Sequence, residues 1–137
     1  MKNTLQKIDL IPDNSIVIGS GIFQVLGIRQ SKDIDLIISQ KAFDTLKESK
    51  KFLLTENHKG EALKRSKFEI SSNWLVLGGT YKFEDLIKET TIIDGVRYIN
   101  LNFIYKVKQY SVRTVNPPRT KDVNDVNLIE EYLNNYN

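Results

Sequence analysis

The sequence predicts an α/β protein with a mixed β-sheet. Its elements begin in the order helix, strand, helix, strand, continue with further strands, and end with two helices. Residues 15–38 place a helix-length segment between two short apolar runs, which is the pattern of a β-α-β opening. Further short apolar segments follow, separated by turn residues, and they indicate antiparallel strands. Amphipathic segments at 101–113 and 120–134 complete the chain. This order of elements is typical of a mixed sheet covered by helices.

Each predicted element has a local reason in the sequence. Pro12 ends a first short helix, a Gly19-Ser20 turn begins the second, and the unbroken apolar run 36–38 suits a strand covered on both faces. Asp94-Gly95 between two apolar segments is a strong signal for a two-residue hairpin turn. The predicted helices cover 5–10, 20–28, 42–46, 83–88, 101–113 and 120–134. The predicted strands cover 15–19, 33–38, 51–55, 61–65, 67–72 and the two arms of a hairpin over 91–99.

The composition fits one domain over residues 1–137, with 40% hydrophobic and 27% charged residues. The absence of cysteine excludes disulfides, zinc–thiolate sites and thiol nucleophiles. The sequence shows neither a signal-peptide core nor a membrane-length apolar run, so we expect a cytoplasmic protein with no membrane partner. The net charge is +3, and one region is rich in cations that either attract a polyanion such as RNA or simply face solvent. These cations are Lys47, Lys50, Lys51, Lys59, Lys64, Arg65 and Lys67.

Two acidic residues, Asp33 and Asp35, stand where the second predicted strand begins. Side chains two residues apart in a strand point to the same face, about 7 Å apart along the chain. A carboxylate pair suits Mg²⁺, which completes its coordination with waters and substrate phosphates. The Gly19-Ser20 turn, placed before a helix, offers backbone N–H groups to an anionic phosphate. Together these residues indicate phosphoryl or nucleotidyl transfer.

The last two predicted helices carry charges on their inner faces. At about 100° per residue, Lys108 falls in the middle of an apolar stripe, while Asp122 shares the inner face of the final helix and Asp125 lies at its margin. One interpretation is an ion pair between Lys108 and Asp122 that joins the two helices. The other is that Lys108, with the nearby Arg119 and Lys121, contacts phosphate.

Two stretches of the chain resemble a known superfamily. Gly19-Ser20, twelve intervening residues and Asp33-Ile34-Asp35 resemble the signature of the DNA-polymerase-β-like nucleotidyltransferases. More closely, segment 19–38, with Arg29 ahead of the acid pair, is similar to the first motif of the AbiEii-type nucleotidyltransferases. The last motif of that group has its counterpart in Lys108, Arg119, Lys121, Asp122 and Asp125. The resemblance covers the first and last thirds of the chain, whereas residues 40–90 match only in general layout.

The resemblance implies a nucleotidyltransferase-like fold and a Mg²⁺-dependent transfer of a nucleoside monophosphate from a nucleoside triphosphate to an acceptor hydroxyl. Asp33 and Asp35 would hold two Mg²⁺ ions, and a third carboxylate would complete the metal ligands and help to activate the acceptor hydroxyl. Glu69 is the candidate for that third acid because it alternates with Phe68 and Ile70, although most members have aspartate there. Considered alone, Glu69 also fits a solvent-facing residue of an edge strand.

The same resemblance implies how the nucleotide and the acceptor are bound. Phosphate would contact Gly19 and Ser20, and the triphosphate charge would be neutralised by Lys108, Arg29, Arg119 and Lys121. The acceptor that it implies is RNA, such as the 3′ end of tRNA, in a toxin–antitoxin system. A small hydroxylated molecule is the other acceptor class, since related nucleotidyltransferases modify antibiotics.

Two interpretations of other classes stay open. Because the chain is short for this group, it also fits a catalytically silent binding module such as an antitoxin subunit, and we expect a protein partner or a homodimer. A structural RNA-binding domain would use the cationic region and need neither Mg²⁺ nor triphosphate. Outside these motifs, we expect His58 in a surface loop and Trp74 in the core or at its rim. Gly78-Gly79 lacks the following Lys-Ser/Thr of a P-loop and is expected to form a turn.

Overall fold

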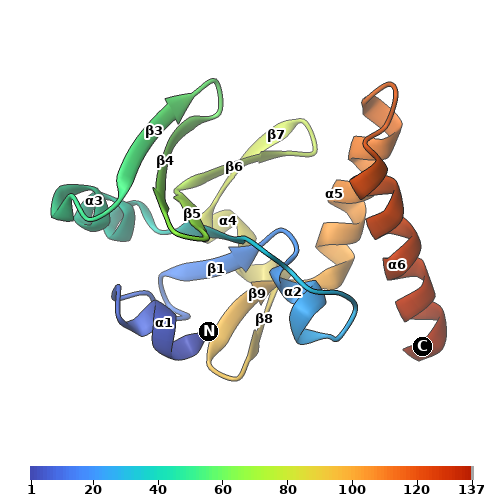
Figure 1. The fold of residues 1–137 in the computed structure, drawn as a ribbon, viewed down its shortest axis with the longest axis horizontal. Coiled ribbons are helices and arrows are strands. Elements are labelled where there is room, and N and C mark those ends of the chain that lie inside the picture. The colour runs from blue at the N-terminus through green and yellow to red at the C-terminus, as the bar shows by residue number, and fades with distance from the viewer. Residues whose placement is uncertain (137) are drawn as a thin grey trace.

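In the computed structural model, which describes residues 1–136, a seven-stranded mixed sheet forms the centre of the molecule (Figure 1). Its strand order is β3-β4-β5-β2-β1-β9-β8, and β6 and β7 pair separately as a two-stranded sheet. The strands are β1 (Ser15–Ile18), β2 (Ile34–Ile38), β3 (Leu53–Asn57), β4 (Gly60–Arg65), β5 (Phe68–Ser71), β6 (Asn73–Val76), β7 (Gly79–Lys82), β8 (Thr90–Ile93) and β9 (Val96–Ile99). The helices are α1 (Lys2–Gln6), α2 (Gly21–Val25), α3 (Gln40–Ser49), α4 (Phe83–Leu86), the 3₁₀ turn η1 (Ile87–Glu89), α5 (Leu101–Thr114) and α6 (Thr120–Tyr136).

The pairing of the central strands confirms the predicted mixed α/β fold. β2 is antiparallel to β1 but parallel to β5, and β1 is parallel to β9. The prediction that the run 36–38 belongs to a central strand is confirmed, because β2 is the fourth of seven strands and these side chains are almost fully buried. Covered faces on both sides explain why this strand is continuously apolar rather than alternating.

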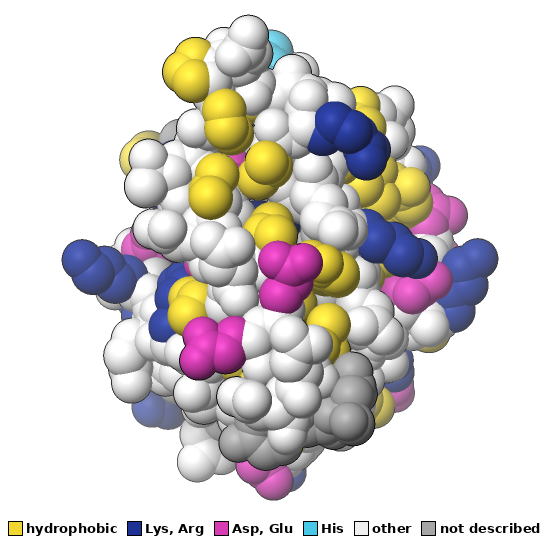
Figure 2. Space-filling view, turned by 90° about the vertical axis from the view of Figure 1, so that its right-hand side faces the viewer, with side chains coloured by type: hydrophobic (Ala, Val, Ile, Leu, Met, Phe, Trp, Pro, Cys, Tyr) yellow, Lys and Arg dark blue, Asp and Glu magenta, His cyan; other side chains and the backbone are white. Residues whose placement is uncertain are grey.

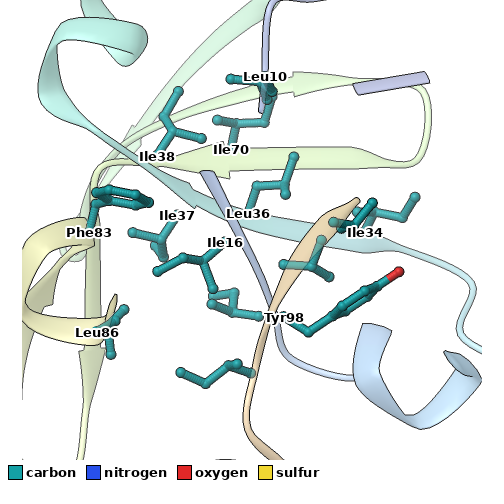
Figure 3. Packing of buried hydrophobic residues seen from close by; sticks show 14 of the residues in the cluster. Leu10, Ile16, Ile34, Leu36, Ile37, Ile38, Ile70, Phe83, Leu86 and Tyr98 are labelled. Carbon is teal, nitrogen blue, oxygen red and sulfur yellow. The ribbon is translucent and has the colours of Figure 1, made fainter. Parts of the chain in front are cut away.

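The core lies around the inner strands. Side chains from β1, β2, β5 and β9 contact one another in a single hydrophobic cluster, and Phe83 and Leu86 of α4 close one side of it (Figure 3). α5 and α6 lie side by side along one side of the molecule, whereas α3 lies on the opposite side near β3 and β4 (Figure 1). Within residues 1–136, no helix is both long enough and apolar enough to cross a bilayer.

The first two predicted helices end earlier in the structure than the sequence predicts. The first ends at Gln6 rather than near residue 10, because Asp9 adopts a left-handed φ of 60° and the resulting turn buries both Leu5 and Leu10. The second ends at Val25 instead of residue 28, because Gly27 with φ 74° begins a Schellman-type cap in which Ile28 N donates to Phe23 O.

The hairpin formed by β6 and β7 was not predicted as strands. Its turn contains Leu77 at φ 55° and Gly78 at φ 73°, so Gly78 does lie in a turn as expected. Leucine is an unusual residue at a left-handed position, where asparagine or aspartate gives the recognisable hairpin signal. The predicted hairpin over 91–99 is confirmed, with Asp94 and Gly95 both at positive φ between β8 and β9.

Candidate functional site

Asp35 and Glu69 lie side by side on neighbouring strands. β2 and β5 are parallel, with Asp35 in register with Glu69, so the two carboxylates project from the same face of the sheet. β5 lies between β4 and β2, so the alternative placement of Glu69 on an edge strand is wrong. Glu69 is 47% exposed, and its Oε1 lies 4.0 Å from Nζ of Lys64 on β4. Asp33 immediately precedes β2 and is exposed.

The acidic residues influence one another electrostatically. Burial raises the pKa of Asp35 above its usual value, and the negative charges of Glu69 and Asp33 raise it further. Lys121 and Lys108 act in the opposite direction on the same pKa. The ionised form of Asp35 is therefore a group that an added cation would stabilise.

The Gly19-Ser20 turn lies directly against Asp35. In the antiparallel pair of β1 and β2, Ile18 is in register with Asp35, so the turn begins beside this carboxylate. Gly19 has φ 65°, and a Cβ added there would lie 3.1 Å from Asp35 Oδ2. Any other residue would strain the backbone and crowd the carboxylate, which explains the glycine in physical terms.

Two serines fix this turn to the segment that carries Asp33. Ser31 Oγ donates to the carbonyl oxygen of Asp33 at 3.0 Å, and Ser20 Oγ lies 2.7 Å from Ser31 Oγ. Because the Ser31 proton is used on Asp33, Ser20 is the donor in the bond between the serines. The structure thus gives Ser31 a place in the site that the sequence motifs did not show. Since α2 has only five residues, its dipole contributes less than the predicted longer helix would.

Lys108 forms the ion pair that the helical periodicity suggested as one of its two roles. Lys108 Nζ donates to Asp122 Oδ1 at 2.9 Å and lies 3.1 Å from Asp125 Oδ2. Ser111 Oγ donates to the other oxygen of Asp122 at 2.8 Å. The side chains of Lys108, Asp122 and Asp125 are 16%, 5% and 2% exposed. This network joins α5 to α6 and places one cation between two buried carboxylates.

Asp122 stays ionised because its partners outweigh its burial. Burial alone would raise its pKa, but hydrogen bonds from Lys108 and Ser111, together with the charges of Lys108 and Arg119, lower the pKa of Asp122 below its usual value. Arg119 lies 4.0 Å from Asp122 and is 66% exposed, and Lys121 is exposed in the first turn of α6. Both are therefore free to contact a ligand without breaking a buried bond.

Arg29 contacts Asp125 of α6 and not the acidic residues at the cleft floor, Asp35 and Glu69. Its Nε and Nη2 donate to Asp125 Oδ1 and Oδ2 at 2.9 and 3.0 Å, which is a bidentate pair. Its guanidinium also lies 4.9 Å from the ring centre of Phe23. The sequence placed Arg29 beside the acid pair, but only the fold shows that its partner is 96 residues further along the chain.

A cleft of about 770 Å³ lies where these elements meet. Asp35 and Glu69 line it on the sheet side, and Lys108 and Lys121 line it on the side of α5 and α6. Asp33 and Arg29 do not line it. The remaining walls come from the two hairpins, β3–β4 and β6–β7, and from the second half of α5. The cleft thus has an acidic floor and a basic wall, together with apolar surface such as Trp74.

The cationic region of the sequence divides between several surfaces. Lys47 pairs with Glu61, whereas Lys64, Arg65 and Lys67 are exposed at the end of the sheet that carries the acids. There Lys64 is in register with Glu69, and the carbonyl of Lys67 accepts from the N–H of Ile34. The face on the α6 side instead mixes acidic, basic and hydrophobic side chains without a continuous patch of one charge (Figure 2). A polyanion would therefore find its cations beside the acids, on β4 and the turn after it.

The acidic residues fit Mg²⁺ only together with a substrate. Among residues 1–136, no group of three or more His, Cys, Asp or Glu side chains is arranged to hold a metal ion by itself. Mg²⁺ is commonly bound by one or two carboxylates and by substrate phosphates and waters, and Asp35 with its neighbours supplies oxygen donors of that kind. The donor chemistry thus fits a metal that arrives with a triphosphate.

Two other residues lie where the sequence predicted. His58 is exposed in the turn between β3 and β4, outside the core. Trp74 is partly buried, and its ring lies 5.7 Å from that of Phe103 while another side lines the cleft. Trp74 is therefore a rim residue that also contributes apolar surface to the cleft.

Comparison with known proteins identifies the fold. No protein-family profile matches the chain, and no curated protein matches it. Among solved structures, the solution structure of the antibiotic-resistance factor ANT(2'')-Ia, which has substrate-regulated conformation dynamics, is similar with a TM-score of 0.57. The match has 18% sequence identity and covers 97% of this chain and 86% of that one. ANT(2'')-Ia is a nucleotidyltransferase of the polymerase-β-like superfamily, so the chain has a nucleotidyltransferase-like fold.

Proposed function

We propose that this protein is a nucleotidyltransferase that moves a nucleoside monophosphate from a nucleoside triphosphate to an acceptor hydroxyl and releases pyrophosphate. The observation that supports it best is the pairing of Asp35 with Glu69 against the Gly19 turn, at the floor of a cleft with a basic wall. The fold shared with ANT(2'')-Ia supports the same reaction class. A silent binding module would gain nothing from placing Glu69 and Asp33 beside Asp35, where burial and their negative charges raise the pKa of Asp35.

In this proposal, the acids hold the reacting groups in place. Mg²⁺, when bound with the triphosphate, would stabilise the charge on the attacking and leaving oxygens. Asp35 and Asp33 would supply the carboxylate ligands. Glu69, which is exposed and next to Asp35, would accept the proton of the acceptor hydroxyl while the hydroxyl oxygen bonds to the α-phosphorus. The bond from the α-phosphorus to the bridging oxygen breaks, and pyrophosphate takes the electron pair.

The basic wall would hold the triphosphate. Lys121 and Arg119 are exposed, and both line the cleft, so they would bind the β- and γ-phosphates directly. Lys108 lines the cleft from within its ion pair and would add positive potential without leaving Asp122. Gly19 and Ser20 would bring backbone N–H groups to a phosphate beside Asp35.

A nucleic acid is the acceptor class that the charge distribution favours. Lys64, Arg65 and Lys67 lie next to Glu69 at the same end of the sheet and could bind the phosphates that precede a terminal hydroxyl. RNA is also the acceptor that the AbiEii-type resemblance implies, with a toxin–antitoxin setting. A small hydroxylated molecule, as for antibiotic-modifying enzymes, is the second acceptor class, and a cationic one would be repelled by these residues.

The experiment is a transfer assay with α-³²P-labelled nucleoside triphosphates. The protein is incubated with Mg²⁺, each triphosphate and either short RNAs with free 3′ ends or a panel of aminoglycosides. We expect label on RNA and release of pyrophosphate, both lost in Asp35→Asn. No transfer to any acceptor by a folded wild-type protein would contradict the proposed reaction, and transfer to aminoglycosides alone would contradict the acceptor class.

A further inference from the structure

Asp125 is the most buried carboxylate of the charge network, and the function proposed above gives it no part. Its side chain is 2% exposed, and both of its oxygens are used. Oδ1 accepts from Arg29 Nε at 2.9 Å, and Oδ2 accepts from Arg29 Nη2 at 3.0 Å and lies 3.1 Å from Lys108 Nζ. One carboxylate on α6 thus binds two cations that come from different parts of the chain.

Arg29 begins the segment 29–33, which connects α2 to β2 and carries Asp33. The bonds that hold this segment to α2 are neutral: Ser31 N donates to Gln24 Oε1 at 3.1 Å, and the serine hydroxyls bond as described above. The bond to α6 is the charged, bidentate one between Arg29 and Asp125. Bidentate arginine–carboxylate pairs are among the strongest and most directional hydrogen bonds in proteins.

We propose that Asp125 is a positioning residue that sets the segment carrying Asp33 relative to Lys108 in the basic wall of the cleft. Through Arg29 it holds the segment with Asp33 and Ser31, and it holds Lys108 on α5 directly. If the carboxylate were lost, only the neutral bonds to α2 would hold the segment 29–33, so these bonds, including that from Ser31 N to Gln24 Oε1, would open more often. The consequence for nucleotide binding rests on the function proposed above, whereas the positioning itself needs no nucleotide.

Asp122 provides the matched control for Asp125. It lies on the same helix one turn earlier, is 5% exposed and also binds Lys108. Its other described partners are Ser111 and Arg119, not Arg29. A change that merely loosens α6 should therefore affect the segment 29–33 equally in Asp122→Asn and Asp125→Asn. A positioning role of Asp125 should affect it in Asp125→Asn alone.

The test is amide hydrogen exchange followed by NMR in the full chain. The amide exchange rates of Ile28 and Ser31 are divided by that of Leu36 in the central strand, which corrects them for exchange through global unfolding. A hydrogen bond to a charged group corresponds to roughly tenfold or more in an equilibrium, so we expect about tenfold faster relative exchange in Asp125→Asn. In Asp122→Asn we expect a ratio within about twofold of the wild type. Equal acceleration in both variants, or none in Asp125→Asn, would overturn the proposal.

Two further measurements keep the outcome decisive. Arg29→Lys keeps the charge but loses the fork, and because Arg29 is 25% exposed this variant tests the same bond from its less buried side. It should accelerate the same amides if Asp125→Asn fails to fold. Calorimetric binding of the four nucleoside triphosphates with Mg²⁺ then separates the two proposals. If wild type binds none, the proposed function fails while the exchange data still decide the role of Asp125. If wild type and Asp125→Asn bind a triphosphate equally well, the effect of the segment 29–33 on nucleotide binding is contradicted.

Discussion

Replacement of Lys108 by methionine tests the network that joins α5 to α6. Methionine keeps the length and apolar stem of lysine but removes the ammonium, so Asp122 and Asp125 lose a shared cation. Removing one partner of a buried ion pair costs about 3–5 kcal/mol when the other charge is left alone. Here Asp122 retains its bond from Ser111, and Asp125 retains both bonds from Arg29. We therefore expect a smaller loss than that range, about 2–3 kcal/mol.

That loss corresponds to a measurable change in melting temperature. For a chain of 137 residues, each kcal/mol lowers the melting temperature by about 3–4 °C, so Lys108→Met should melt roughly 6–12 °C below wild type. The matched control is Lys106→Met on the exposed face of α5, which should change the melting temperature by less than about 2 °C. Differential scanning calorimetry at neutral pH measures both.

The same variant separates the structural role of Lys108 from its role in nucleotide binding. Adding Asp122→Asn to Lys108→Met removes the carboxylate left without its cation, so the double variant should be more stable than the sum of the single changes predicts. A melting temperature of Lys108→Met within about 2 °C of wild type would refute the reasoning about the network. A large fall in melting temperature with unchanged triphosphate affinity would show that Lys108 is structural only.

Three more predictions concern the acids and the cations beside them. The raised pKa of Asp35 means that the folded protein binds more protons than the unfolded chain between pH 3.8 and that raised pKa, so its ionisation destabilises the fold as pH rises. Asp35→Asn should therefore melt higher than wild type at pH 7 and lose this advantage near pH 4; a lower melting temperature at pH 7 would contradict it. Glu69→Gln should retain the wild-type melting temperature, since Glu69 is exposed, but reduce transfer by at least about hundredfold, and wild-type transfer rates would exclude a proton acceptor at this position. Reversing Lys64 and Lys67 to glutamate should lower RNA affinity and reduce the salt dependence of binding by about two phosphate contacts; an unchanged salt slope would place the RNA elsewhere.

The fold was predictable wherever local sequence determines structure. Consecutive apolar side chains at 36–38 are all buried only if the strand is covered on both faces of the sheet. Asp94 and Gly95 readily adopt the positive φ values that a tight hairpin turn needs. The β6–β7 hairpin was not predictable in the same way, because Leu77 occupies a left-handed position that its side chain does not favour. There, the pairing of Trp74 with Tyr81 and the packing of both rings on Phe103 determine the structure.

The site was predictable in its residue types but less so in its contacts. Alternation in 68–70 singled out Glu69, yet only the register of two parallel strands places it next to Asp35. The periodicity of α5 placed Lys108 on the inner face, and Asp122 proved to be its partner. The bond from Arg29 to Asp125 spans 96 residues, and no local pattern indicates a contact of that separation. This contact depends on how α6 packs against the rest of the protein, and the local sequence of neither segment predicts that packing.

The most direct test of a metal–triphosphate site at Asp35 is calorimetric binding of each nucleoside triphosphate to wild type and to Asp35→Asn, with and without Mg²⁺. The acids and the cleft predict binding that requires Mg²⁺ and is lost in the variant, while the variant stays folded and melts no lower than wild type. Binding that survives in Asp35→Asn, or its absence from a folded wild-type protein with every triphosphate, would contradict a metal–triphosphate site at Asp35.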